Sequence, residues 1–311
     1  MASANDTELG SQTTQFAEAS AGGKIIVLGE HAVVYGHTAL AGAIGNLVTC
    51  RASATSQPSS LSVPAWNIEV SASDEDVPAS ALRALLAAAN VDSVALHVFS
   101  DVPPAAGLGS SAALCLAIAR CLTPNATEAE HRDIAAAGEA QFHNQPSGID
   151  VALSQCGGIA RYDRANGLVP LEVPAFSLVV GLSGVSRSTA VQVGNVASRM
   201  RSDGGITAAA IAEMGACAEA GIEALLAGNM AALGQCMSAC HRELQSAGVS
   251  LACLDSMVAI AMEAGALGAK LTGAGGGGAM IALAPGREDE VRAALQAQNY
   301  EAFVTTLGAT K

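Results

Sequence analysis

The chain has 311 residues, which exceeds the usual size of a single domain, so we expect two domains of moderate size. Half of the residues are hydrophobic, but Gly, Ser or charged residues interrupt each apolar run well before the roughly 20 residues of a membrane span. The net charge of -13 argues against a nucleic-acid surface, which needs clustered Lys and Arg. Composition therefore predicts a soluble protein with neither a nucleic-acid nor a membrane partner.

The N-terminal segment and the cysteines both indicate a cytoplasmic protein. Residues 1–20 are polar and have neither a basic start nor an apolar stretch, so we interpret them as a mobile tail rather than a signal peptide. The eight cysteines lack the spacing of a disulfide framework, which suits a reducing compartment. We interpret them as small core residues.

The first half of the chain mixes strand-like and helix-like segments. The run KIIVL at 24–28 predicts a buried strand that ends at Gly29. Further strand-like runs lie near 47–54, 66–70 and 94–100. Helix-like patterns cover 80–89, a segment that opens at Ser110, and 127–143. We expect an N-terminal mixed α/β domain.

Prolines at 170 and 174 mark the expected domain boundary, so the domains are predicted to cover 21–174 and 175–311. After a strand that begins at Ser177, helical patterns cover 189–201, 206–226, 230–244 and 251–264. The strand-like runs AKLTG and GAMIAL, a short helix after Pro285 and a strand near 301–306 complete the chain. This is an elaborated ferredoxin-like order, which makes the whole protein an α+β fold.

The stretch from Ser100 to Leu122, SDVPPAAGLGSSAALCLAIARCL, has the features of a phosphate-binding loop. Gly107 and Gly109 free the backbone before an apolar helix, so several N–H groups and the helix dipole can point at an anion. The alternative is an ordinary strand-turn-helix connection with Ser110 as N-cap. The chain has no GxxxxGK[ST] motif, which excludes an ordinary P-loop.

A second glycine cluster, KLTGAGGGGAMIAL, runs from Lys270 to Leu283 and holds five glycines between Gly273 and Gly278. Because glycine is costly to order, such a run indicates close approach to the main chain, although a flexible hairpin turn remains open. Only three lysines occur in the chain, and Lys24 and Lys270 both lie in glycine-rich segments. This placement favours phosphate binding.

Two further segments bring polar residues to the ends of predicted elements. The segment GGKIIVLGEHAVVYG places Lys24, Glu30 and His31 around the end of a strand. The alternative is that His31 is a structural histidine and Glu30 a solvated loop carboxylate. GEAQFHNQPSGIDVALSQCGG places Glu139 on a helix and Asp150 after a turn. Because Ser147 and Asp150 fit the S-x-x-D pattern, Asp150 is either catalytic or a helix-capping carboxylate.

In this order, the four segments resemble the galactokinase, homoserine kinase, mevalonate kinase and phosphomevalonate kinase (GHMP) superfamily from about Gly22 to Leu307. GEHAVVYG, PSGID with its following Gly pair, and GVSRST narrow the resemblance to the mevalonate kinase branch of compact prokaryotic type. The resemblance implies a two-domain fold with the active-site cleft between the domains. It also implies transfer of the γ-phosphoryl group of ATP, with Mg²⁺, to the 5-hydroxyl of (R)-mevalonate in isoprenoid precursor biosynthesis.

The same resemblance implies roles for particular residues. Asp150 would accept the hydroxyl proton, and Lys24 would lie beside it and beside the transferring phosphoryl group. Ser111 and Glu139 would hold the magnesium ion. The residues expected to contact ATP are Ser100, Ala105, Ala106, Gly107, Leu108, Gly109, Ser110 and Ser111. The residues expected to contact mevalonate are Glu30, His31, Arg187 and Thr189.

Some alternatives stay open at this point. Phosphomevalonate kinase and mevalonate 3-kinase are the closest alternatives within the superfamily, and a silent metabolite-binding protein would keep the fold without the activity. Gly22 and Ala105 stand where proline and glycine are common in the superfamily, which predicts altered loop stiffness rather than lost activity. The oligomeric state is left open, a homodimer included.

Overall fold

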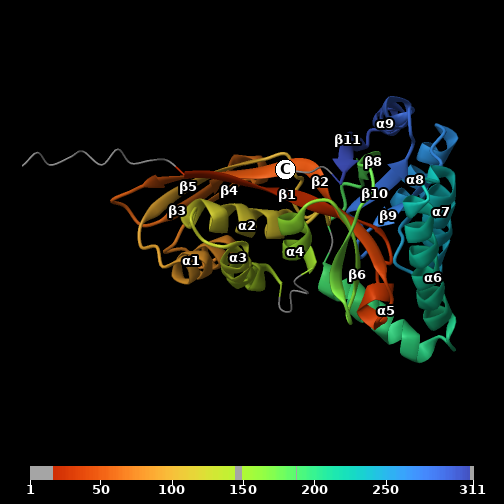
Figure 1. Ribbon diagram of the computed structural model, residues 1–311, viewed down its shortest axis with the longest axis horizontal. Coiled ribbons are helices and arrows are strands. Elements are labelled where there is room, and N and C mark those ends of the chain that lie inside the picture. Colours follow the sequence, from red (N-terminus) through yellow and green to blue (C-terminus); the bar gives the residue numbers. More distant parts are fainter. Residues whose placement is uncertain (1–16, 144–148, 187, 309–311) are drawn as a thin grey trace, which may run out of the picture.

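The computed structural model describes residues 17–143, 149–186 and 188–308. Figure 1 shows an elongated molecule, with the N-terminal elements at one end and helices α6 to α9 at the other. One sheet runs through both halves, with the strand order β4-β3-β5-β2-β11-β8-β10-β9, while β1 and β6 pair with β2 and β7 pairs with β6. The two halves of the chain therefore share a continuous hydrogen-bonded frame.

The N-terminal half is a curled sheet with helices packed on one of its faces (Figure 1). Its strands are β1 (Ala17–Leu28), β2 (Ala39–Ala54), β3 (Ser60–Val63), β4 (Ile68–Ser71), β5 (Val94–Ser100), β6 (Ile159–Asp163) and β7 (Gly167–Leu171). Its helices are α1 (Val77–Ala89), α2 (Ser110–Leu122), α3 (Glu128–Phe142) and α4 (Ile149–Cys156), with short 3-10 turns at Ala32–Tyr35 and Pro64–Trp66. Helix α2 is buried along nearly its whole length because its sequence is almost entirely apolar.

The C-terminal half has the expected ferredoxin-like order. Its strands are β8 (Phe176–Leu182), β9 (Gly268–Thr272), β10 (Ala279–Leu283) and β11 (Glu301–Leu307). Its helices are α5 (Thr189–Ser202), α6 (Ile206–Leu226), α7 (Met230–Ser246), α8 (Ala252–Glu263) and α9 (Glu288–Ala297). In the sheet these strands lie in the order β11-β8-β10-β9, with the last strand beside the first, as in ferredoxin-like domains.

Three expectations need correction. The expected tail reached residue 20, but Ala17 to Ser20 belong to β1 and pair with β2 from Ala17 opposite Ala52 to Ser20 opposite Thr49; residues 1–16 lie outside the described residues. The hairpin of β6 and β7 was not predicted. Cys156 is exposed, so the interpretation of all eight cysteines as core residues was wrong for this one.

No helix in the described ranges is long and apolar enough to cross a membrane.

Helix α7 and strand β9 meet through two glycines. A Cβ atom added at Gly268 would lie 1.9 Å from the backbone oxygen of Gly234. Backbone atoms on both sides leave no flexible side chain to move away. The close packing of α7 on β9 therefore depends on the absence of a side chain at this position.

We predict that Gly268→Ala lowers the free energy of unfolding by about 1–3 kcal/mol, because the added methyl group forces α7 away from β9. Gly194→Ala on α5 is the matched control, since a Cβ there meets nothing within 4 Å and alanine favours the helix. Urea denaturation of both variants measures the difference. A Gly268→Ala variant as stable as wild type would contradict the packing described here.

Candidate active site

The loop between β5 and α2 is shaped by residues with positive φ. Ala105, Gly107 and Gly109 have φ angles of 55°, 83° and 74°. Gly109 is the N-cap of α2 and makes no side-chain cap hydrogen bond. Ser110 is therefore the first helical residue and not the cap that the ordinary reading of this loop required. The first N–H groups of α2 are left for an anion or for water.

Ser100 stabilises the start of this loop. Its hydroxyl donates to the oxygen of Val102 at 3.0 Å and accepts from the N–H of Val102 at 3.1 Å. Ala106, Leu108 and Gly109 are buried, whereas Ala105 is exposed. The predicted ATP-contacting residues thus comprise Ser100, which stabilises the beginning of the loop, the turn at 105–109, and the first two residues of α2, Ser110 and Ser111.

Lys24 connects this loop to Asp150. Its N–H donates to the oxygen of Leu108 at 2.8 Å, and its Nζ donates to the oxygen of Gly107 at 3.4 Å. The same Nζ lies 3.1 Å from Oδ1 of Asp150. The Lys24 side chain is only 6% exposed and the Asp150 side chain 36%, so the ammonium is fixed while the carboxylate stays accessible.

Asp150 lies in the first turn of α4. Its observed partner is Lys24, an interaction that the capping hypothesis did not include. Ser147, the other member of that hypothesis, lies outside the described residues, so its part in capping stays untested.

Glu139 of α3 lies next to the start of α2. Its Oε1 accepts from the Ser111 hydroxyl at 3.1 Å, and its Oε2 is buried without a hydrogen-bond partner among the described residues. Burial raises the pKa of Glu139 to about 7; the nearby Asp150 charge adds to the rise, and the Ser111 hydrogen bond and Lys24 oppose it. A buried oxygen without a partner, beside a hydroxyl, is a donor set that suits a hard divalent cation.

His143 also belongs to this cluster, although sequence reasoning did not select it. Its Nε2 lies 3.3 Å from the Ser111 hydroxyl oxygen and 3.4 Å from Oε1 of Glu139. The i, i+4 spacing from Glu139 on a helix was the signal that could have found it.

Glu30 and His31 contact a different part of the chain, namely β9 and the glycine-rich loop that follows it. Glu30 forms an ion pair with Lys270, and their side chains are 1% and 0% exposed. The His31 ring Nε2 lies 3.0 Å from the oxygen of Ala274. Lys270 is therefore buried against a carboxylate, so its position in a glycine-rich segment does not make it a phosphate ligand as we had expected.

The glycine loop itself is crowded by the protein's own chain. Added Cβ atoms at Gly275, Gly276 and Gly277 would lie 2.2 Å, 2.1 Å and 2.4 Å from their nearest neighbours. Those neighbours are the oxygens of Val249 and Val185 and the side-chain amide of Gln192. The expected close approach is thus made by backbone and by α5, and the loop is also a hairpin turn, because it joins the antiparallel strands β9 and β10.

Thr189 is the first residue of α5 and is exposed. The segment before it is tied to the glycine loop, because the N–H of Gly278 donates to the oxygen of Val185 at 2.9 Å. Arg187 lies outside the described residues. The structure thus joins Lys24, Ser111, Glu139 and Asp150 in one cluster, and Glu30 and His31 with the glycine loop in another.

Comparison with known proteins shows the family to which this chain belongs. The model for the GHMP kinases N terminal domain matches residues 76–158, and the model for GHMP kinases C terminal matches residues 222–302. The chain belongs to the GHMP kinase family. This confirms the predicted fold, with an N-terminal and a C-terminal GHMP kinase domain.

Among the relatives are archaeal mevalonate kinases that cover almost the whole chain. The mevalonate kinase of Thermococcus gammatolerans is 34% identical over 308 residues, covering 89% of this chain and 92% of the relative. That of Methanothermobacter thermautotrophicus is 33% identical over 298 residues, covering 92% and 95%.

A solved structure of L. major mevalonate kinase in complex with R-mevalonate has a TM-score of 0.86 and 29% identity, covering 96% of this chain and 98% of that one. The Methanococcus jannaschii mevalonate kinase has a TM-score of 0.80 with 22% identity, covering 96% and 99%, which supports the fold alone. The resemblance found in the sequence motifs is confirmed over the whole chain.

Glu139 predicts a pH dependence of stability. Its pKa is raised in the folded protein from 4.5 to about 7, so the folded state holds a proton that the unfolded state releases. Unfolding should therefore become easier as pH rises from 4.5 to about 7, by an amount on the order of 3 kcal/mol, and the effect should level off above that range.

Glu139→Gln should lack this slope and gain stability relative to wild type between about pH 5 and about pH 8. Urea denaturation at the two pH values measures it, with Glu263→Gln on an exposed face of α8 as the control that keeps the wild-type slope. Parallel slopes in wild type and Glu139→Gln would contradict the raised pKa.

The buried pair of Glu30 and Lys270 predicts a large loss of stability when one partner is removed. Lys270→Met leaves an uncompensated buried carboxylate and should cost about 3–5 kcal/mol of unfolding free energy. The double variant Lys270→Met with Glu30→Leu should recover much of that loss, because it removes both charges. Denaturant titration tests this, and a single variant within about 1 kcal/mol of wild type would refute it.

Proposed function

We propose that this protein is a mevalonate kinase, which transfers the γ-phosphoryl group of ATP to the 5-hydroxyl of (R)-mevalonate to give 5-phosphomevalonate and ADP. The observation that carries the proposal is the 3.1 Å contact between Lys24 Nζ and Asp150 Oδ1 beside the loop of free helix N–H groups. The archaeal mevalonate kinases that match almost the whole chain support the choice of substrate.

In the proposed reaction, the oxygen of the mevalonate 5-hydroxyl attacks the γ-phosphorus, and ADP leaves. Asp150 accepts the proton that the hydroxyl loses. The Asp150 carboxylate is accessible and lies beside the Lys24 ammonium, which suits this role. Lys24 offsets the charge of the phosphoryl oxygens, and the backbone of 105–111 holds the phosphates. Phosphoryl transfer needs mainly such alignment and charge compensation, since little covalent help is required.

Magnesium fits the proposed site because Ser111 offers a hydroxyl and Glu139 a buried carboxylate oxygen without a partner among the described residues. When bound, the ion would neutralise phosphate charge. The raised pKa of Glu139, about 7, means that a cation must compete with a proton for this carboxylate at neutral pH.

The mevalonate side is proposed to consist of Glu30, His31, Arg187 and Thr189. The Glu30 oxygen Oε2 has no hydrogen-bond partner among the described residues, which leaves an acceptor for a substrate hydroxyl. An arginine at 187 offers the fork geometry that suits the mevalonate carboxylate. These roles imply that the substrate lies between the phosphate loop and the glycine loop.

The proposal extends to domain limits and location. We place the domain boundary near residue 174, in agreement with family matches that end at 158 and resume at 222. The proposed active-site cleft lies between the two domains. We also propose that the enzyme is cytoplasmic and acts in the mevalonate pathway.

Substrate choice is tested by ADP release with mevalonate, phosphomevalonate, homoserine and galactose in parallel. Turnover with mevalonate, and a product phosphorylated at the 5-oxygen by ³¹P and ¹H NMR, is the expected result. A product phosphorylated at the 3-oxygen, or turnover of phosphomevalonate alone, would reassign the acceptor within the family. Silence with all four compounds, together with ATP binding, would favour a metabolite-binding protein.

Asp150→Asn should lower kcat by roughly two to four orders of magnitude while leaving ATP affinity close to wild type, because a positioned base is lost and the phosphate loop is untouched. Asp133→Asn, on the exposed face of α3, is the matched control and should retain full turnover. Steady-state kinetics and nucleotide titration measure both. Near-normal turnover of Asp150→Asn would leave that residue a structural role only.

A further inference from the structure

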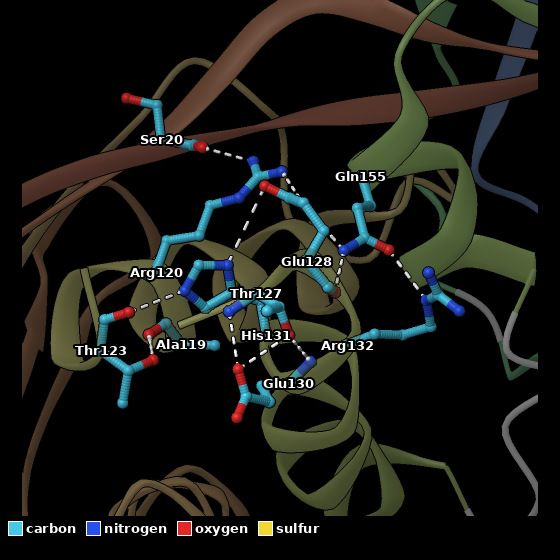
Figure 2. A network of polar contacts seen from close by, with 10 residues as sticks. All are labelled: Ser20, Ala119, Arg120, Thr123, Thr127, Glu128, Glu130, His131, Arg132 and Gln155. Atoms are coloured by element: carbon cyan, nitrogen blue, oxygen red, sulfur yellow. Dashed lines mark hydrogen bonds and ion pairs between the residues drawn. The ribbon is translucent and has the colours of Figure 1, made fainter. Parts of the chain in front are cut away.

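A chain of polar contacts links the four elements that carry Lys24, Ser111, Glu139 and Asp150 (Figure 2). On α2, the Arg120 guanidinium donates to the backbone oxygen of Ser20 in β1 at 2.9 Å and to Glu128 Oε2 in α3 at 2.9 Å. On α4, the Gln155 amide donates to the same Glu128 oxygen at 2.7 Å. The network thus runs from β1 through α2 and α3 to α4.

Gln155 is held on both sides of its amide. Its Nε2 also donates to the backbone oxygen of Glu128, and its Oε1 accepts from Arg132 Nε at 2.8 Å (Figure 2). The residue is only 7% exposed and Arg120 only 9%. The Glu128 side chain that accepts these bonds is 60% exposed, but the buried amide and guanidinium would lose a partner that water does not readily replace at their burial.

The part of α3 that receives Gln155 is itself fixed. Thr127 and Glu130 form a capping box at the start of the helix. The His131 ring Nε2 lies 2.9 Å from the oxygen of Thr123, in the turn that follows α2. Glu128 therefore presents its carboxylate from a helix end whose position is already set.

Helix α4 needs such a directional anchor. It has only 8 residues, with Asp150 in the first turn and Gln155 in the last, about 7.5 Å apart along the axis. Val151 and Leu153 are buried and hold the helix in the core. Apolar contacts, however, are non-directional and do not fix the rotation of a two-turn helix about its axis.

We infer that Gln155 is a positioning residue: through Glu128 it sets the rotation of α4, and thereby holds the Asp150 carboxylate against Lys24 Nζ. The inference rests on the proposed function, in which Asp150 is the base. According to this inference, the contacts among Arg120, Glu128 and Gln155 fix the geometry of the reacting groups and do not merely stabilise the fold.

The test exchanges the two partners. Gln155→Glu places a second carboxylate against Glu128, which is an acceptor only, so the contact should break and α4 should turn. Adding Glu128→Gln restores a donor: the new amide at 128 can donate to the new carboxylate at 155 and accept from Arg120, while Arg132 pairs with that carboxylate. The exchange therefore restores the side-chain contact between positions 128 and 155 with the charge moved by one residue, and only the bond from Gln155 to the backbone oxygen of residue 128 stays lost.

We expect Gln155→Glu to lower kcat roughly 100-fold, the scale of a misplaced catalytic group, with KM for ATP within about 2-fold of wild type. The double variant should recover most of that loss. Asp76→Ala is the control for stability, because it removes the N-cap hydrogen bond of α1 to the N–H of Ala79 and lies outside the network of Arg120, Glu128 and Gln155. It should lower Tm and leave kcat unchanged.

A second readout does not depend on the substrate. The chain has only three lysines, Lys24, Lys270 and Lys311, so ¹³C-labelled lysine gives three Cε signals, and Lys24→Arg assigns that of Lys24. In Gln155→Glu, the Lys24 signal should move toward its position in Asp150→Asn, and it should return in the double variant. If wild type fails to phosphorylate mevalonate, the proposed function falls, while this signal still tests the positioning of Asp150.

A Lys24 signal in Gln155→Glu that coincides with wild type would overturn the inference. So would a shifted signal that Glu128→Gln does not restore. If Gln155→Glu fails to fold, Gln155→Asn replaces it for the Lys24 signal without the Glu128→Gln step, because the Asn amide is one methylene too short to reach Glu128.

Discussion

The site depends on the place of Lys24, whose ammonium joins the phosphate loop to Asp150. That place is set by tight packing of backbone on both sides. A Cβ atom added at Gly23 would lie 2.8 Å from the oxygen of Leu108, and one added at Gly109 would lie 2.8 Å from Cγ of Lys24. Two glycines therefore let β1 and the loop approach until one ammonium contacts both the loop and Asp150.

Strand β1 also connects the two halves of the site. Lys24 lies near its middle, and Glu30 and His31 follow its end, where they contact Lys270 and Ala274. Thr272 of β9 adds a hydrogen bond from its hydroxyl to the oxygen of Ile26 at 2.8 Å. The elements that the proposal assigns to ATP and to mevalonate are thus positioned by the same strand.

Local patterns predicted the elements well where apolar periodicity ends at a clear signal. Helix α2 begins at Ser110 and α6 covers Ile206–Leu226, as expected from their apolar runs and flanking glycines. The first residues of β1 were missed because they are small or polar and become a strand only by pairing with β2. Lys270 was misjudged because its partner, Glu30, is 240 residues away, and no local pattern reports such a contact. The proposed roles of Asp150 and Glu139 came from family motifs, and what the structure adds is the contact of Asp150 with Lys24 and that of Glu139 with Ser111.

A crystal structure with a non-hydrolysable ATP analogue, Mg²⁺ and mevalonate tests the central claim most directly. The account predicts the γ-phosphate within hydrogen-bond distance of Lys24 Nζ and the 5-hydroxyl of mevalonate against the Asp150 carboxylate. A nucleotide bound away from the 105–111 loop, or a mevalonate whose 5-hydroxyl does not reach Asp150, would contradict it.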